Sequence, residues 1–195
     1  MKRVCHERKL NRLPNYDYAQ CGWYFVTICT KDMVECFGKI ENDKMVLNRC
    51  GVIAYKCWLE ISRHFCDVSL DEFAIMPNHV HGIIVIEDVN VVVGNKNFCS
   101  RRTPYTIPWQ TKLSRSLSSI VRGFKIGVTK GCHENNIIGF HWHKSFHDHI
   151  IHNENELNNI RSYIQNNPSK WFRDRNNHYD YINLDQGNKK CTDAW

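Results

Sequence analysis

Two histidines separated by a single residue are the first feature of this sequence that can do chemistry. His79 and His81 lie in residues 76–86 (MPNHVHGIIVI), where an apolar run after Pro77 predicts a β-strand. Side chains alternate between the two faces of a strand, so both imidazoles project from one face, about 7 Å apart along the strand, and can close on one metal ion. Gly82, on the other face, allows a neighbouring backbone or a ligand to approach closely. The pair alone leaves two alternatives open, a metal site and two hydrogen-bonded histidines at a strand end.

A tyrosine and an asparagine four residues apart form the second feature. Residues 155–167 carry apolar side chains at helical spacing, and Pro168 ends the predicted helix. Tyr163 and Asn167 therefore share one face of that helix. A phenol can act as a nucleophile, and an amide oxygen one turn away can bind a hard cation. Spacing alone favours a plainer alternative, in which the tyrosine packs on the sheet and the asparagine caps the helix.

Positive charge gathers in one part of the chain, which has a net charge of +6 as a whole. Residues 89–133 contain eight Lys or Arg and no Asp or Glu. Aromatic rings are interleaved with these cations at Phe98, Tyr105, Trp109 and Phe124. Cations that bind phosphates, beside rings that stack on bases, are typical of a groove for single-stranded nucleic acid. The alternative is a solvated basic face without a partner.

Composition and cysteine usage indicate a globular protein of a reducing compartment. Hydrophobic residues make up 42% of the chain and charged residues 24%. No apolar run approaches the roughly 20 residues of a membrane span, and the basic N-terminus lacks an apolar signal core. The ten cysteines include no CxxC pair, which disfavours a cysteine-rich zinc site. We expect a cytoplasmic protein with reduced thiols and one domain over 1–195, its core at about 10–175 and a polar tail at about 176–195.

The order of predicted elements indicates an α+β fold. Runs of apolar, aromatic and β-branched residues predict strands, and apolar residues four apart, such as Ile53, Cys57 and Ile61, predict helices. Strands are expected at 23–30, 37–40, 45–48, 68–76 and 79–86, helices at 51–65, 114–130 and 155–167, and a long loop at about 87–113. Strands joined in this order favour an antiparallel sheet with the helices packed on one face.

Several longer segments of the sequence resemble those of one protein family. LPNYDYAQCGWYFVTICT, MVLN, EFAIMPNHVHGIIVI, SLSSIVRGFK and NELNNIRSYIQNNPSKW follow one another between about residues 10 and 174. Together they resemble the REP-associated tyrosine transposases, relatives of the single-tyrosine HUH (IS200-like) transposases. The resemblance implies a ferredoxin-like antiparallel sheet, the HUH endonuclease fold. It further implies that His79, His81 and Asn167 bind Mg²⁺ or Mn²⁺ and that Tyr163 is the nucleophile.

The activity implied by this resemblance is cleavage and joining of single-stranded or hairpin DNA. Attack by Tyr163 on a phosphate would give a 5′-phosphotyrosine and a free 3′-hydroxyl, in a protein acting as a monomer or a homodimer. No contact with a membrane is expected. The candidate DNA-binding residues are Arg101, Arg102, Lys112, Arg115, Arg122, Lys125, Lys144, His149 and Arg161.

One segment departs from the family pattern. Residues 141–152 read HWHKSFHDHIIH, where the family has Trp-Gln-Arg-Asn-Tyr-Tyr-Glu-His-Ile-Ile-Arg. Lys144 stands in place of an arginine, and lysine does not reproduce the two-pronged grip of guanidinium on phosphate. The five histidines of this segment also suggest a second transition-metal site as an alternative. Two functions therefore remain open, a DNA strand transferase and a DNA-binding protein of the same fold that has lost catalysis.

Overall fold

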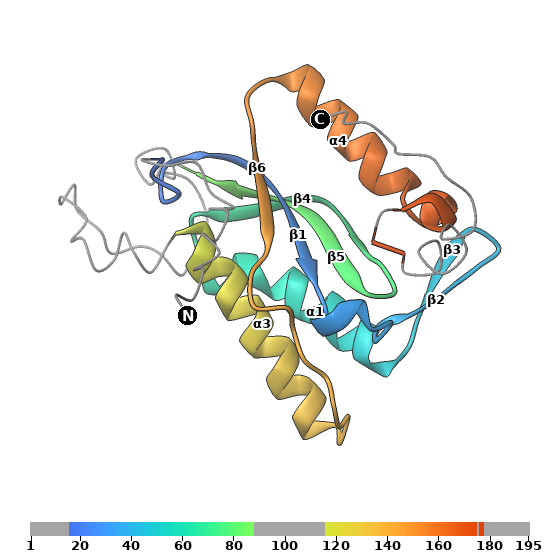
Figure 1. Ribbon diagram of the computed structural model, residues 1–195. Coiled ribbons are helices and arrows are strands. Elements are labelled where there is room, and N and C mark those ends of the chain that lie inside the picture. Colours follow the sequence, from blue (N-terminus) through green and yellow to red (C-terminus); the bar gives the residue numbers. More distant parts are fainter. Residues whose placement is uncertain (1–15, 88–115, 175, 178–195) are drawn as a thin grey trace, which may run out of the picture.

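The computed structural model describes residues 16–87, 116–174 and 176–177. The strands are β1 (Gly22–Cys29), β2 (Gly38–Glu41), β3 (Lys44–Leu47), β4 (Val68–Ile75), β5 (His79–Ile86) and β6 (His147–Ile151). The helices are α1 (Arg49–His64), α3 (Leu117–Glu134) and α4 (Glu154–Asn166), with short 3-10 helices η1 (Lys31–Met33) and η2 (Pro168–Arg173). Figure 1 shows one sheet with helices above and below it.

The main sheet has the strand order β4-β5-β1-β6, and all of its neighbouring strands are antiparallel. β1 and β5 occupy the centre, while α1 lies in the connection from β1 to β4 and α3 in the connection from β5 to β6. β2 and β3 form a separate hairpin before α1. Leaving that hairpin aside, the βαββαβ order with its first and third strands in the centre is the ferredoxin-like arrangement. The predicted α+β fold with an antiparallel sheet is confirmed.

One face of the sheet packs against α1 and α3. Val26 of β1 and Val80 and Ile84 of β5 are buried there together with Trp58 of α1. Gly82 faces the same way, and a Cβ atom at this residue would lie 2.2 Å from Cζ2 of Trp58. The missing side chain of Gly82 therefore makes room for the indole ring of Trp58. The sequence had suggested that a backbone or a ligand would approach there.

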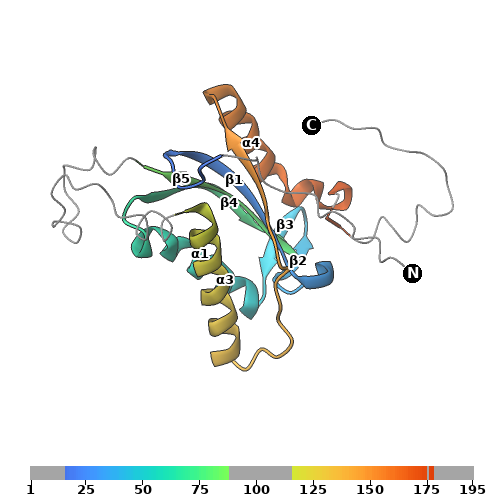
Figure 2. The same ribbon diagram turned by 60° about the vertical axis from the view of Figure 1, so that its left-hand side comes forward.

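The opposite face of the sheet is covered by α4. Ile83 of β5 is buried there with Leu157 and Ile164, which form the apolar stripe of this helix. Figure 2 shows α4 on one side of the sheet and α1 and α3 on the other. The helices thus divide between two faces, whereas the sequence placed all of them on one. The difference follows from β5, which is apolar on both faces beyond His81 and so needs a cover on each.

Some element boundaries differ from those that the sequence indicates. α1 begins at Arg49 because the side chain of Asn48 accepts a hydrogen bond from the backbone N–H of Gly51, which caps the first turn. α3 continues to Glu134, four residues beyond its predicted end. β6 was not predicted at all. It is five residues long and begins with polar residues, so only its pairing with β1 makes it a strand.

The described cysteines are reduced, in line with the state expected from the sequence. Cys50 of α1 and Cys132 of α3 meet inside the protein with their Sγ atoms 3.3 Å apart. Burial raises the pKa of both thiols, so they stay protonated and pack as small apolar groups.

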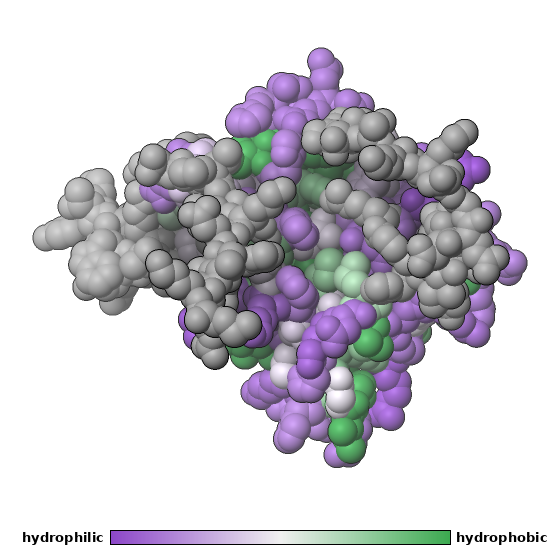
Figure 3. All heavy atoms as spheres, in the orientation of Figure 1, coloured by the Kyte–Doolittle hydropathy of each residue, from purple (hydrophilic) through white to green (hydrophobic). Residues whose placement is uncertain are grey.

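The outward side of α4, at the top of the space-filling view, is largely hydrophilic (Figure 3). In that view the described apolar residues form small separate patches. Within the described ranges, no helix is both long enough and apolar enough to cross a lipid bilayer.

Candidate metal and tyrosine site

His79 and His81 point from β5 toward the face that α4 covers, and both are almost fully buried, at 0% and 1% exposure. Their ring centroids lie 4.3 Å apart. Because Val80 and Ile84 are buried on the opposite face, the alternation inferred from the sequence holds along this strand. Two imidazoles held this close, with little access to bulk water, can bind one cation between them.

Hydrogen bonds of Asn78 determine which nitrogen of His79 carries the proton. The amide Nδ2 of Asn78 donates to the backbone oxygens of Met33 at 3.1 Å and Asn176 at 2.7 Å. Its Oδ1 therefore faces Nδ1 of His79, at 2.8 Å, and accepts a hydrogen bond from the N–H of that nitrogen. The lone pair of the neutral ring is then on Nε2, the nitrogen left for a metal. Oriented in this way, His79 resembles a metal-binding histidine with its usual outer partner.

Thr27 plays the corresponding part for His81. The two residues are directly opposite in the β1–β5 register, and Thr27 Oγ1 lies 2.9 Å from Nδ1 of His81. This contact leaves Nε2 of His81 directed toward α4. Asn78 and Thr27 did not emerge from the sequence as site residues. Thr27 has no local signal, because its role depends on the pairing of two strands, whereas Asn78 could have been noticed as the residue that precedes His79.

α4 brings Tyr163 to this pair of histidines. The hydroxyl of Tyr163 lies 3.3 Å from Nε2 of His81. Phe25 of β1 stacks on the imidazole of His81 with centroids 5.3 Å apart, and it meets the ring of Tyr163 edge-on at 6.1 Å. Tyr163 is nevertheless 42% exposed. Its phenol is therefore packed in a defined position beside His81 and is still accessible from outside.

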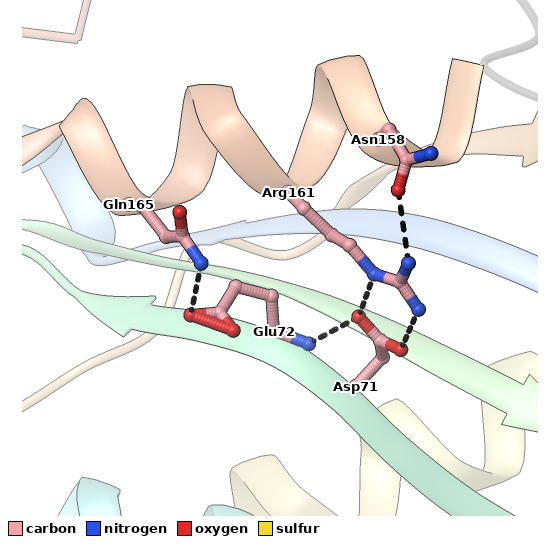
Figure 4. A network of polar contacts seen from close by, with 5 residues as sticks. All are labelled: Asp71, Glu72, Asn158, Arg161 and Gln165. Atoms are coloured by element: carbon pink, nitrogen blue, oxygen red, sulfur yellow. Dashed lines mark hydrogen bonds and ion pairs between the residues drawn. The ribbon is translucent and has the colours of Figure 1, made fainter. Parts of the chain in front are cut away.

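A polar network fixes α4 against β4 (Figure 4). Nε and Nη2 of Arg161 donate to the two carboxylate oxygens of Asp71 at 2.8 and 2.7 Å, and Nη1 donates to Asn158 at 3.0 Å. One turn further along, Gln165 donates to Glu72 at 3.2 Å. The Arg161 fork holds the pKa of Asp71 below its ordinary value. The network thus ties the helix that carries the tyrosine to the edge of the sheet.

Asn167 directly follows the last residue of α4, and Asp174 directly follows η2. Asn167 is 2% exposed, and its Nδ2 donates to Oδ2 of Asp174 at 3.1 Å. Its Oδ1 is buried and accepts no hydrogen bond from the described residues. Metal-ligating atoms of His79, His81 and Asp174 all lie within 4.8 Å of one another. Two imidazole nitrogens and one carboxylate oxygen form a donor set that can hold Mn²⁺ or a similar divalent cation. The role of Asn167 as a ligand stays a prediction.

Asp174 is the member of this cluster that the sequence did not indicate. It lies seven residues beyond Asn167, after the proline that ends the predicted helix, and no spacing rule connects it with His79. Across the described ranges, it completes the one group of three or more His, Cys, Asp or Glu residues close enough to hold an ion. The described histidines of residues 141–152 form no such group, so the alternative of a second metal site there gains no support.

Three of the predicted DNA-binding cations come together on the other side of the sheet. Arg122, Lys125 and Lys144 line a groove of about 820 Å³ between α3 and residues 144–146. Its described lining includes no Asp or Glu. Lys125 Nζ donates to the backbone oxygens of His143 and Ser145, both at 2.9 Å, and burial lowers its pKa. Arg122 and Lys144 are thus the cations of this set most available to a ligand.

The remaining DNA-binding predictions have different outcomes. Arg161 is engaged with Asp71, and Nε2 of His149 lies 2.6 Å from Oε1 of Glu156. For these two residues a role in DNA binding stays a prediction, and it would compete with the internal pairs. Four further candidates fall outside the described residues, namely Arg101, Arg102, Lys112 and Arg115.

Comparison with known proteins identifies a relative in sequence and a solved structure of the same fold. No protein-family model matches the chain. An uncharacterized protein of Haemophilus influenzae is 41% identical over 170 residues, which cover 87% of this chain and 93% of the relative. The chain belongs to the same family as that protein. A solved REP-associated tyrosine transposase bound to a REP hairpin matches with a TM-score of 0.52 and 17% identity, covering 82% of this chain and 73% of the other. The chain shares the fold of that transposase, as the family resemblance of its sequence segments implied.

Proposed function

We propose that this chain is a metal-dependent nuclease and strand transferase for single-stranded DNA, with Tyr163 as its nucleophile. The observation that carries the proposal is the position of the Tyr163 hydroxyl, which lies 3.3 Å from Nε2 of His81. His81 in turn forms a cluster with His79 and Asp174 that could hold a metal ion. A phenol on a helix and two histidines on a strand of another layer have no structural need to meet in this way. The transposase fold supports the same reading.

The chemistry would be an in-line displacement at phosphorus. The oxygen of Tyr163 forms a new bond to phosphorus while the bond from phosphorus to the 3′ oxygen breaks, so that one phosphoester replaces another. The phenol loses its proton, the 3′ oxygen leaves as a hydroxyl, and the 5′ end stays on the tyrosine. Because the energy of the ester is conserved, attack by another 3′-hydroxyl can rejoin the DNA without ATP.

A phenol has an ordinary pKa of about 10, so Tyr163 by itself is a weak nucleophile at neutral pH. His79, His81 and Asn167 would hold Mg²⁺ or Mn²⁺, which when bound offsets charge on the scissile phosphate and orients it. Phe25 and His81 keep the phenol ring in place through the contacts described above. Partial exposure of Tyr163 leaves room for a phosphate to reach its hydroxyl.

The substrate that we propose is a hairpin-forming strand. The solved transposase of the same fold is bound to a REP hairpin. In this chain the groove with Arg122 and Lys144 is suited to the phosphates of such a ligand. α3 and α4 lie on opposite faces of the sheet, so a strand held in the groove would reach Tyr163 by passing around the edge formed by β6.

A covalent-adduct assay tests the proposal. A hairpin-bearing oligonucleotide labelled at its 3′ end is incubated with the protein and Mn²⁺, and labelled protein is measured on a denaturing gel. We expect an adduct with the wild type and none with Tyr163→Phe, which leaves DNA binding intact. Tyr55→Phe is the matched control, since Tyr55 is also 42% exposed but lies on α1, behind the sheet. Undiminished adduct in Tyr163→Phe refutes the assignment.

One observation favours a second candidate, a DNA-binding protein without catalysis. Arg161 and His149, two of the residues expected to bind DNA, are paired with Asp71 and Glu156. If the chain has lost catalysis, it binds the hairpin with an affinity that falls steeply with salt concentration and gives no adduct with either Mg²⁺ or Mn²⁺. The same gel, combined with a binding titration at several salt concentrations, separates the two functions.

A further inference from the structure

We propose that Asp174 is itself a ligand of the metal and supplies the negative charge that the site of His79, His81 and Asn167 lacks. The inference deepens the metal site of the proposed function and rests on it for the identity of the ion as a divalent cation. It assigns a role to a residue that lies three positions beyond Trp171, where the last segment that carries the family resemblance ends.

The first argument is the placement of the Asp174 carboxylate. One of its oxygens and one nitrogen from each of His79 and His81 lie within 4.8 Å of one another, close enough to surround a single ion. The three residues come from β5 and from the chain after η2, elements that lie far apart in the sequence. The Nδ1 atoms of His79 and His81 are engaged with Asn78 and Thr27, which leaves the two Nε2 atoms to form one mixed donor set with the carboxylate.

The second argument is that Asp174 is held by the same residues that orient the histidines. Its Oδ1 accepts the backbone N–H of Asn176 at 2.7 Å, and the backbone oxygen of Asn176 accepts from Nδ2 of Asn78 at 2.7 Å. Oδ1 of the same Asn78 side chain accepts a hydrogen bond from the Nδ1–H of His79. A single amide thus positions one imidazole and fastens the segment that carries the carboxylate. These bonds use only part of the acceptor capacity of a carboxylate, which has about four lone-pair sites.

Asn167 provides an independent observation. Its Nδ2 donates to Asp174 Oδ2, and the opposite orientation of the amide would direct its oxygen at the carboxylate and lose that bond. Oδ1 is therefore left as a buried oxygen that accepts no hydrogen bond from the described residues. An unsatisfied oxygen inside a protein has a cost of about 1–3 kcal/mol unless something binds it. A cation next to Asp174 would satisfy it.

Charge explains what the carboxylate adds. Two neutral imidazoles and an amide have dipoles but no net charge, and nitrogen is not the ligand that Mg²⁺ prefers. Adding Asp174 gives a set of two nitrogens and two oxygens with one negative charge, which suits Mn²⁺ better than Mg²⁺. The remaining coordination positions would stay available to phosphate oxygens.

The test is a Mn²⁺ titration of the full-length protein, with unbound Mn²⁺ measured by electron paramagnetic resonance. We expect Asp174→Asn to bind at least about tenfold more weakly than the wild type. This substitution keeps an oxygen that can accept the Asn176 N–H, so the turn is retained, and a thermal melt verifies that the variant folds. Asp43→Asn is the control, because it removes the same charge from an exposed turn whose φ of 60° asparagine adopts readily.

Each result of this titration has a separate meaning. The inference is overturned if Asp174→Asn binds Mn²⁺ as tightly as the wild type while His79→Ala loses the ion. It is supported if Asp174→Asn and His79→Ala are both weakened and Asp43→Asn is not. A third result is also possible, in which Asp174→Asn loses affinity for Mn²⁺ but the wild type forms no DNA adduct. This result would support Asp174 as a metal ligand and reject the proposed strand transfer.

Discussion

Gly82→Ala is the substitution for which the structure gives the sharpest expectation. The new methyl group would lie 2.2 Å from Cζ2, 2.7 Å from Cη2 and 3.0 Å from Cε2 of Trp58. Carbon atoms in contact are ordinarily about 3.5–4.0 Å apart, so the strand and the ring must separate by more than about 1 Å. Trp58 cannot move freely, because it is fully buried and packs against Phe73 and Phe124 with centroids 5.7 and 5.2 Å away.

The magnitude follows from overpacking. Adding carbon to a tightly packed core typically costs about 1–3 kcal/mol, and a clash with a rigid indole belongs at the upper end of that range. Replacing glycine by alanine within a strand returns about 0.5–1 kcal/mol of backbone entropy. We therefore expect Gly82→Ala to lower the free energy of unfolding by about 2 kcal/mol. The strain falls on β5 next to His81, so the Mn²⁺ binding that we propose should weaken as well.

Urea unfolding followed by far-ultraviolet circular dichroism measures this effect without relying on tryptophan fluorescence. Gly123→Ala on α3 is the control, since its Cβ would meet Phe65 at an ordinary 3.6 Å. A helical glycine replaced by alanine should gain up to about 1 kcal/mol. Trp58→Phe removes the outer ring atoms that clash, so the double variant with Gly82→Ala should be more stable than the sum of the two single changes predicts. A single variant within about 0.5 kcal/mol of the wild type, or strict additivity, refutes the reasoning.

Two further predictions concern titratable groups. Arg161 holds the pKa of Asp71 below its ordinary value, so this carboxylate stabilises the fold above about pH 4 and loses its effect as the pH falls through its folded pKa. The urea midpoint of Asp71→Asn should therefore fall less than that of the wild type between pH 5 and pH 3, which is roughly the range of carboxyl titration. An equal fall in both proteins contradicts the pairing of Asp71 with Arg161. Burial raises the pKa of Cys50, so a disulfide reagent should modify exposed Cys21 and Cys66 first and reach Cys50 only after unfolding, as mapped by mass spectrometry. Modification of Cys50 in the folded protein at the rate of Cys66 contradicts this.

Much of the local structure could be predicted from the sequence, because local structure depends on the spacing of neighbouring residues. Alternation along residues 79–86 placed both histidines on one face, and the burial of Val80 and Ile84 on the other confirms it. Helical spacing likewise gave the apolar stripe of α4 and the shared face of Tyr163 and Asn167. β6 was missed for the same reason, since its short polar start has no period and only pairing with β1 makes it a strand.

The tertiary structure decided which of these elements meet. α4 covers the face opposite to α1 and α3 because β5 is apolar on both sides, and only that placement brings Tyr163 to His81. The β1–β5 register selects Thr27 as the partner of His81, and the chain after η2 returns Asp174 to the same place. Contacts of this kind arise because the protein buries both faces of its sheet at once. The order of neighbouring residues determines which side of a strand or helix is apolar. It does not determine which other element packs against that side.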